Sequence, residues 1–242
     1  MQVQTPPHRY KLPIKRTDRV LEVGSGHHPH PKAQVIVDKF IDSNYHRKTD
    51  IKVLKNQEFI QADGADMPFS DNEFDYVICN QVLEHVDDPA AFLNEQSRVA
   101  KRGYLETPSV VGEYLFPKES HRWLILPIDG KLIIMDKAAN WFDSQFDFGL
   151  LFLTYLQRTS MGYKILRDTR PNIWTTRYAW EGRIEFEVNP DNPEYRKYFT
   201  GPWDETMIRR FFPEQSKPRE FMDAFSSMVR IGWQAVTGTT KF

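Results

Sequence analysis

The strongest constraint on this chain is a short apolar run that stops at a pair of glycines. Residues 19–23 read RVLEV and residues 24–26 read GSG. The run has the length and composition of a buried strand, and the glycines predict a tight turn directly after it. Glycine has no Cβ, so such a turn lets the backbone approach a ligand closely. A ligand site at the end of a buried strand is therefore the first hypothesis.

Further strands follow at regular intervals. Residues 35–38 and 59–63 are short strand candidates, the second of them weaker, and 74–80 is the clearest, with β-branched and aromatic residues throughout. Residues 104–107 are a fifth, stopped by Pro108. Between the last two, Asp88 as N-cap and Pro89 at the first position predict a helix, with Gly103 as the residue after its end. Strands that alternate with helical or loop crossovers predict a mostly parallel sheet with covered faces.

After residue 110 the pattern changes. Residues 123–128 and 131–135 flank Asp129-Gly130, and residues 177–180 and 183–188 flank Glu181-Gly182, so two hairpins are predicted. Residues 139–158 predict a helix whose leucines belong to the core. A polar surface loop or linker is expected over 191–202, and helices over about 204–212 and 217–236.

Composition limits the classes of protein that remain. The 242 residues carry a formal charge of -1, which gives no overall field for nucleic acid. One cysteine, Cys79, excludes an internal disulfide, and no apolar stretch has the length of a membrane span. A soluble cytoplasmic protein is expected. We divide it into an extension (1–17), a main domain (18–190, with a cofactor half 18–108 and acceptor-side elements 109–190) and a helical appendage packed on it (191–242).

The first motif also admits a dinucleotide, because an acid that closes the second strand can bind ribose hydroxyls. The dinucleotide fingerprint needs a third glycine at position 29, where this chain has Pro29. The order of motifs instead resembles the class I S-adenosylmethionine-dependent methyltransferases. The resemblance covers residues 18–108 and rests on the segments VLEVGSG (20–26), ADGADMPF (62–69), FDYVICNQVLEHV (74–86) and RVAKRG (98–103).

This resemblance implies a Rossmann-like, doubly wound, mostly parallel sheet with added C-terminal hairpins and helices. It also implies S-adenosyl-L-methionine as cofactor, with Asp38 on the ribose and Asp63 at the adenine. The full set of cofactor residues that it implies is Glu22, Gly24, Ser25, Gly26, Asp38, Asp63, Gly64, Ala65, Asn80 and Gln81. The chain departs from the family in two ways: His28 stands where a third glycine is usual, and only 14 positions separate Gly24 from Asp38. The first helix should therefore be short or replaced by a loop.

Transfer of a methyl group to a neutral hydroxyl requires a base. His85, just after the fourth strand, and His121, after the fifth, are the candidate catalytic residues, with Glu106 and Glu113 as weaker ones. The histidines at 27, 28 and 30 invite a metal hypothesis, but their spacing makes joint ligation awkward, and no metal is expected.

The acceptor must be inferred from the second half of the chain. The stretches 106–109 and 121–123 resemble methyltransferase domains of glycan and surface-polysaccharide assembly, so O-methylation of a sugar or glycan hydroxyl is the first hypothesis. N-, O- or C-methylation of a quinone-like or natural-product small molecule is the alternative, and a catalytically silent cofactor-binding scaffold is a third. The apolar stripe of the last helix, with Phe221, Phe225 and Trp233, suits either the core or a homodimer partner.

Overall fold

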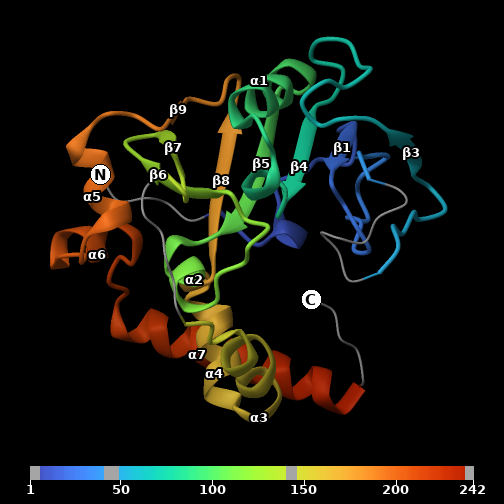
Figure 1. Ribbon diagram of the computed structural model, residues 1–242. Helices are drawn as coiled ribbons and strands as arrows, with labels where there is room; N and C mark the ends of the chain where they lie inside the picture. The colour runs from blue at the N-terminus through green and yellow to red at the C-terminus, as the bar shows by residue number, and fades with distance from the viewer. Residues whose placement is uncertain (1–5, 41–48, 140–145, 238–242) are drawn as a thin grey trace.

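The computed structural model describes residues 6–40, 49–139 and 146–237. Its main sheet has six strands in the order β3-β2-β1-β4-β5-β8. The first five are parallel, and β8 runs antiparallel to β5 (Figure 1). This confirms the predicted α/β fold with a mostly parallel sheet. The strands are β1 (Val20–Val23), β2 (Val35–Asp38), β3 (Glu58–Gln61), β4 (Tyr76–Asn80), β5 (Arg102–Pro108) and β8 (Thr175–Glu181).

The connections of this sheet differ from one another. Residues 24–34 join β1 to β2 through turns and contain no helix, as the short spacing predicts. The β4–β5 crossover contains the short helix η2 (Leu83–His85) and the longer α1 (Pro89–Val99). A side-chain oxygen of Asp88 accepts the Ala91 N–H at 2.9 Å, so Asp88 is the predicted N-cap.

The role predicted for Gly103 is wrong. α1 ends at Val99, and Gly103 lies inside β5, opposite Val77 of β4. A Cβ at this position would lie 2.6 Å from Val77 Cγ1 and 2.8 Å from the Trp180 ring. The glycine is therefore required by packing within the sheet and not by a helix end.

A second, smaller sheet consists of β6 (Trp123–Ile128), β7 (Lys131–Asp136) and β9 (Phe186–Val188). The hairpin predicted at Asp129-Gly130 is confirmed, with both turn residues at positive φ (52° and 84°). The second predicted hairpin is wrong. Gly182 does take a positive φ of 75°, but the strands that flank it belong to different sheets: β8 pairs with β5, and β9 pairs in parallel with β7.

The helices outside the main sheet are η1 (Arg9–Lys11), α2 (Val110–Leu115), η3 (Leu150–Tyr155), α3 (Leu156–Thr159), α4 (Met161–Thr169), η4 (Pro171–Ile173), α5 (Pro193–Thr200), α6 (Glu205–Phe211) and α7 (Lys217–Thr237). The last two confirm the predicted C-terminal helices. The loop predicted over 191–202 is wrong, because Asn192 caps α5 and Pro193 takes its first position. The helix predicted over 139–158 is present only from residue 149 onward; residues 140–145 lie outside the described residues, and 146–148 are not helical.

The core is layered. One face of the main sheet packs against α1 and the inner face of the second sheet, and the N-terminal segment, with Leu12 and Ile14, covers the other. The outer face of the second sheet packs against α5 and α6 (Figure 1). The core position predicted for the leucines of residues 139–158 is wrong, since Leu150 is 78% exposed. Among the helices of the described residues, none combines the length and the apolar content that crossing a bilayer requires.

Candidate active site

The glycine turn after β1 has the backbone that the sequence predicts. Gly24 and Gly26 both have positive φ, 68° and 54°. A Cβ at Gly24 would lie 2.3 Å from Val82 Cγ2, so this turn packs directly against the loop that follows β4. A Cβ at Gly26 would meet nothing within 4 Å. The turn is therefore anchored at its first glycine and open at its second, which suits a close ligand approach.

Glu22, in β1 beneath this turn, is buried and already engaged. One carboxylate oxygen pairs with the Arg9 guanidinium at 2.5 Å, and the other accepts the His30 N–H at 2.6 Å. Burial raises the pKa of Glu22 even though Arg9 and this hydrogen bond act in the opposite direction. Glu22 thus fixes the N-terminal segment and the β1–β2 connection to the sheet. Arg9 was not among the sequence candidates, because nothing in its local pattern shows that η1 reaches β1.

The two acids predicted to bind the cofactor lie at the ends of neighbouring strands. Asp38 ends β2 and accepts the Phe40 N–H at 3.0 Å. Asp63, just after β3, accepts the Ala65 N–H at 3.0 Å and pairs with Lys39 Nζ at 2.7 Å. Partial burial raises the pKa of Asp63, but the hydrogen bonds from Lys39 and Ala65 outweigh it and hold that pKa below its ordinary value. Asp63 is therefore an ionised acceptor at neutral pH.

The remaining predicted cofactor residues surround these acids and the end of β4. Gly64 lies against α1, where a Cβ would come within 2.5 Å of the Phe92 ring. Gln81 has a positive φ of 58°, unusual for a residue with a side chain, and its N–H donates to the Glu106 carbonyl at 2.7 Å. Within the described residues, the buried Ser25 Oγ and Asn80 Oδ1 have no hydrogen-bond partner. Unsatisfied polar atoms at a strand end are typical of a polar ligand site.

His85 and His121, predicted separately from the sequence, lie side by side. Their ring centroids are 4.7 Å apart with an interplanar angle of 73°. His85 Nδ1 lies 2.8 Å from the Ser120 carbonyl oxygen, and His121 Nδ1 contacts Glu113 Oε1. Both partners can only accept, so each Nδ1 carries a proton. The structure therefore brings the two candidate catalytic residues into one cluster.

The acids near this cluster have distinct roles. Glu113, a weaker candidate from the sequence, holds His121 and accepts Lys137 Nζ at 2.9 Å. Burial raises the pKa of Glu113, but the bonds from His121 and Lys137 lower it below its ordinary value. Glu84 is 1% exposed, and burial raises its pKa to about 8. Glu84 was not among the sequence candidates, although it directly precedes His85 in the chain. Glu106, the other weaker candidate, instead accepts bonds from Tyr104 and Arg177.

Within the described residues, the histidines of the β1–β2 connection are not grouped as metal ligands. His30 is 2% exposed, its Nε2 lies 3.1 Å from the Arg9 carbonyl, and its ring stacks on Tyr10. Burial above all, with the nearby Arg9 charge, lowers the pKa of His30 to about 4. In the parts of the chain that the structure describes, the three side chains grouped closely enough to hold a metal ion are Glu84, His85 and His121.

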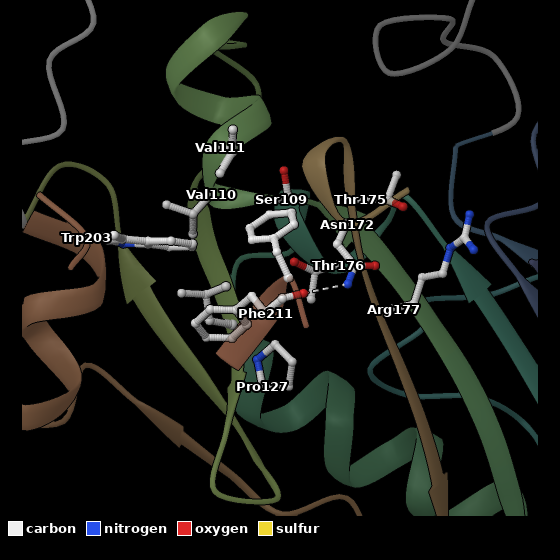
Figure 2. Close-up of a pocket in the computed structure, with 12 residues that line it drawn as sticks. Ser109, Val110, Val111, Pro127, Asn172, Thr175, Thr176, Arg177, Trp203 and Phe211 are labelled. Atoms are coloured by element: carbon white, nitrogen blue, oxygen red, sulfur yellow. Dashed lines mark hydrogen bonds between the residues drawn. The ribbon is translucent and has the colours of Figure 1, made fainter. Parts of the chain in front are cut away.

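A separate cavity of about 30 Å³ lies between α2, β6, η4, β8 and α6. Figure 2 shows Phe211 and Trp203 on one side of it, with Asn172 donating to the Phe211 carbonyl, and the Arg177 guanidinium pointing away. A volume of this size holds about one water molecule, whereas small-molecule sites are roughly tenfold larger. At this volume the cavity is too small to hold a small-molecule acceptor.

Comparison with known proteins finds relatives of part of this chain. Residues 36–105 match the family profile described as a methyltransferase domain. A demethylmenaquinone methyltransferase of Staphylococcus carnosus is 33% identical over 36% of this chain and 38% of its own. A ubiquinone/menaquinone biosynthesis C-methyltransferase of Pseudomonas fluorescens is 28% identical over 52% of this chain and 56% of its own. The matches thus span about half or less of these relatives.

Solved structures include a SAM-dependent methyltransferase from Aquifex aeolicus, 22% identical over 38% of this chain and 57% of that one, with a TM-score of 0.31. The matched segment 36–105 runs from β2 into β5 and includes Asp38, Asp63 and the Glu84-His85 pair. Residues 36–105 are thus a methyltransferase domain of the class I S-adenosylmethionine-dependent kind.

Proposed function

We propose that this protein transfers the methyl group of S-adenosylmethionine to a quinone-like small molecule that carries a hydroxyl group. The observation that carries the proposal is the methyltransferase domain match over residues 36–105, within which Asp38 ends β2 and Asp63 lies just after the neighbouring β3. The carboxyl ends of parallel strands form the edge where ligands bind in open α/β sheets. Glu22 and the glycine turn lie at the same edge, at the end of β1.

The residues at this edge fit the cofactor. Asp38 would accept its ribose hydroxyls, and Asp63 with the Ala65 N–H would contact its adenine. The open side of Gly26 leaves room for the backbone to approach it, and Ser25 and Asn80 each offer a buried oxygen that lacks a partner. When bound, the cofactor supplies an electrophilic methyl group on a sulfonium. The chain itself has to hold the two reactants in line and exclude water.

Two observations support the choice of acceptor: the names of the curated relatives and the proximity of His85 to His121. Both curated relatives named above are quinone-pathway methyltransferases by name, which favours the quinone-like acceptor over the sugar hydroxyl that the sequence put first. An aromatic hydroxyl has to lose its proton before its oxygen, or the ring carbon conjugated to it, attacks a methyl group. We assign the activation of that hydroxyl to His85 and His121, with Glu113 orienting His121.

Cofactor binding is the first test. Calorimetry should detect S-adenosylmethionine and its demethylated product on the purified full chain. Asp38→Asn and Asp63→Asn should each weaken binding by about 1–3 kcal/mol, or roughly 5- to 150-fold in Kd. Asp191→Asn, an exposed aspartate on the connection between β9 and α5, is the matched control and should change nothing. Folded wild-type protein that does not bind the cofactor would refute the proposal.

A product-release assay then separates the acceptor hypotheses. We expect turnover with hydroquinones and none with nucleotide sugars or glycans. Turnover with sugars alone would restore the first sequence hypothesis. Cofactor binding without turnover on any acceptor would favour the silent scaffold.

A homodimer through α7 stays a proposal, supported by the exposure of its apolar stripe: Phe221 is 68% and Trp233 69% exposed. Isolated apolar side chains are common on surfaces, but a contiguous stripe on one helix face is typical of an interface. Sedimentation equilibrium of the wild type and of Trp233→Asp should show a dimer that the substitution weakens. A wild type that is monomeric at all concentrations would exclude this assembly.

A further inference from the structure

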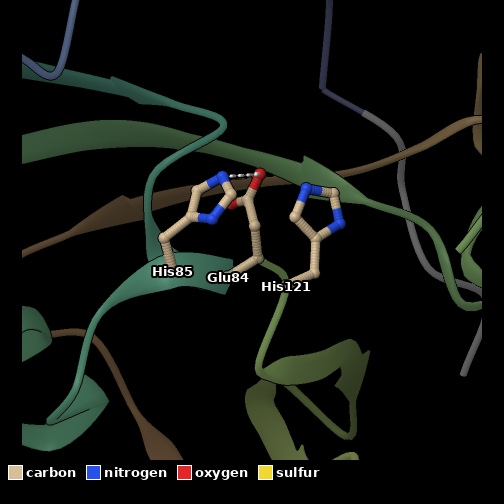
Figure 3. A group of neighbouring side chains, drawn as sticks. All are labelled: Glu84, His85 and His121. Atoms are coloured by element: carbon tan, nitrogen blue, oxygen red, sulfur yellow. Dashed lines mark ion pairs between the residues drawn. The ribbon is translucent and has the colours of Figure 1, made fainter. Parts of the chain in front are cut away.

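The cluster of Glu84, His85 and His121 joins two segments that are far apart in the sequence. Glu84 and His85 belong to η2, directly after β4, and His121 directly precedes β6. The Arg122 N–H donates to the Glu84 carbonyl at 2.8 Å, so the backbone itself holds the segments together. One ligand atom from each of the three side chains lies within 4.8 Å of the others. Figure 3 shows the Glu84 carboxylate between the two imidazole rings.

Glu84 is the unusual member of this cluster. It is 1% exposed, and within the described residues neither carboxylate oxygen has a hydrogen-bond partner. Its carboxylate Oε1 lies 3.9 Å from His85 Nε2, beyond hydrogen-bond distance. A buried carboxyl group with both oxygens unsatisfied costs free energy that a cation ligated by those oxygens would offset.

The histidines are arranged as metal ligands usually are. Each Nδ1 is protonated and held by an acceptor, the Ser120 carbonyl for His85 and the Glu113 carboxylate for His121. The lone pair of each ring is consequently on Nε2, and Figure 3 shows that nitrogen of each ring facing Glu84. A hydrogen bond from the second ring nitrogen to a carbonyl or carboxylate is the outer shell that orients metal-bound imidazoles in proteins. Lys137 in turn fixes Glu113 at 2.9 Å.

We propose that Glu84, His85 and His121 bind one divalent transition-metal ion. Two imidazoles and one carboxylate suit zinc, manganese, iron(II) or cobalt rather than calcium or magnesium, which prefer oxygen ligands. Three protein ligands leave open positions for an exogenous oxygen, as catalytic rather than structural sites do. No metal is expected from the sequence alone, in which the histidines that stand close together are those at 27, 28 and 30.

The inference rests on the proposed function and specifies how the acceptor is activated. The acceptor hydroxyl would occupy an open position, where the cation lowers its pKa and its proton passes to bulk water. For an oxygen acceptor, an oxygen lone pair then forms the new bond to the methyl carbon. The carbon–sulfur bond breaks, and its electron pair stays on sulfur. In this arrangement His85 and His121 act as ligands and do not take the proton themselves.

Metal binding can be measured without methyl transfer. The purified full chain, stripped with a chelator and dialysed, is titrated with Zn²⁺, Mn²⁺ and Co²⁺ by calorimetry, and Co²⁺ is also followed by its visible absorption. We expect one ion per chain. Glu84→Gln and His121→Ala should each weaken binding at least about tenfold, and Glu113→Gln should weaken it by about 10- to 100-fold with all three ligands in place.

His27→Ala is the matched control, because it removes a histidine of the other cluster, and metal stoichiometry and affinity should not change. Circular dichroism and cofactor calorimetry show whether each variant is folded. If the Glu84 or His121 variant is misfolded, the metal affinity of Glu113→Gln is compared with that of the wild type instead. Absence of wild-type binding for all three ions, or unchanged affinity in the folded Glu84 and His121 variants, would overturn the metal site. Turnover that survives chelation would overturn the catalytic role of the metal and leave the methyltransferase proposal intact. Failure of the folded wild type to bind S-adenosylmethionine would refute the methyltransferase proposal and leave the metal site intact.

Discussion

The cofactor half and the C-terminal helices bury their apolar side chains to very different extents. In the main sheet, Val20, Leu21 and Ile78 have no exposed surface. In η3 and α7, by contrast, Leu150 is 78% exposed and Trp233 69% exposed. A strand inside a parallel sheet is covered on both faces, whereas a surface helix needs only one packed face. Similar apolar patterns in the sequence thus lead to opposite environments.

The difference shows what an apolar pattern does and does not specify. An apolar strand in an α/β chain has to lie inside the sheet, because both of its faces must be covered. An apolar stripe on a helix predicts a packing partner, but it does not indicate whether that partner is the core of the same chain or another molecule. α7 does pack against α4, yet Phe221, Phe225 and Trp233 remain exposed within the described residues.

The largest expected effect separates two phenylalanines, one from each region. Phe92 of α1 is 1% exposed, and its ring packs beside Gly64. Phe92→Ala should lower the free energy of unfolding by about 3–5 kcal/mol, because it removes buried surface and leaves a cavity. Phe221→Ala, on α7, should change it by less than about 0.5 kcal/mol, since Phe221 is 68% exposed. Urea unfolding followed by circular dichroism measures both.

The comparison fails if Phe221→Ala costs as much as Phe92→Ala. That result would mean that the stripe on α7 is buried in solution, and a protein-concentration dependence of the effect would identify a second copy as the cover. A small effect at both sites would instead show that α1 contributes little to the stability of the main sheet.

Much of the cofactor half was predictable from local sequence. Strand runs, the Asp88-Pro89 helix start and the Asp129-Gly130 turn are each determined by a few neighbouring residues, and the structure confirms them. Strand pairing was less predictable. The turn at Gly182 is real, but local sequence does not indicate that β8 joins β5 and β9 joins β7.

The candidate site also contains residues that local sequence places and residues that it does not. The positions of Asp38 and Asp63 follow from strand ends, so the sequence was enough to place them on one edge. The contact between His85 and His121 depends on how the segment before β6 folds back over η2, which no local pattern encodes. Arg9 is a similar case, because its pairing with Glu22 spans the N-terminal segment and β1.

A buried histidine of the cofactor half gives a second test, through pH. The environment of His30 requires its neutral form, since Nδ1 accepts the Lys32 N–H at 3.2 Å while Nε2 faces the Arg9 carbonyl. Its pKa is lowered to about 4 in the folded state, against 6.5 in the unfolded chain. Below pH 6.5 the unfolded chain therefore binds the proton first. Stability should fall by about 3 kcal/mol between pH 6.5 and pH 4, and His30 should contribute nothing further below that.

The measurement is urea unfolding at several pH values, with His30→Asn as the variant that cannot take the proton. The fall between pH 6.5 and pH 4 should be smaller in this variant than in the wild type by about the His30 contribution. Parallel curves for the two proteins would show that His30 is not buried in the way the structure describes.

The smallest expected effect concerns the first residues of two helices, one from each region, which both begin with a capping residue followed by proline. Asp88 caps α1 and Asn192 caps α5, each accepting a backbone N–H at 2.9 Å and each followed by proline. Asp88→Ala and Asn192→Ala should each cost about 1 kcal/mol in urea unfolding, and the corresponding glycine variants only a few tenths. α5 packs through Tyr198 and Phe199 on the second sheet, so its cap should count toward global stability as the cap of α1 does. If Asn192→Ala has no effect while Asp88→Ala does, α5 unfolds separately, and the second region is less cooperative as well as more exposed.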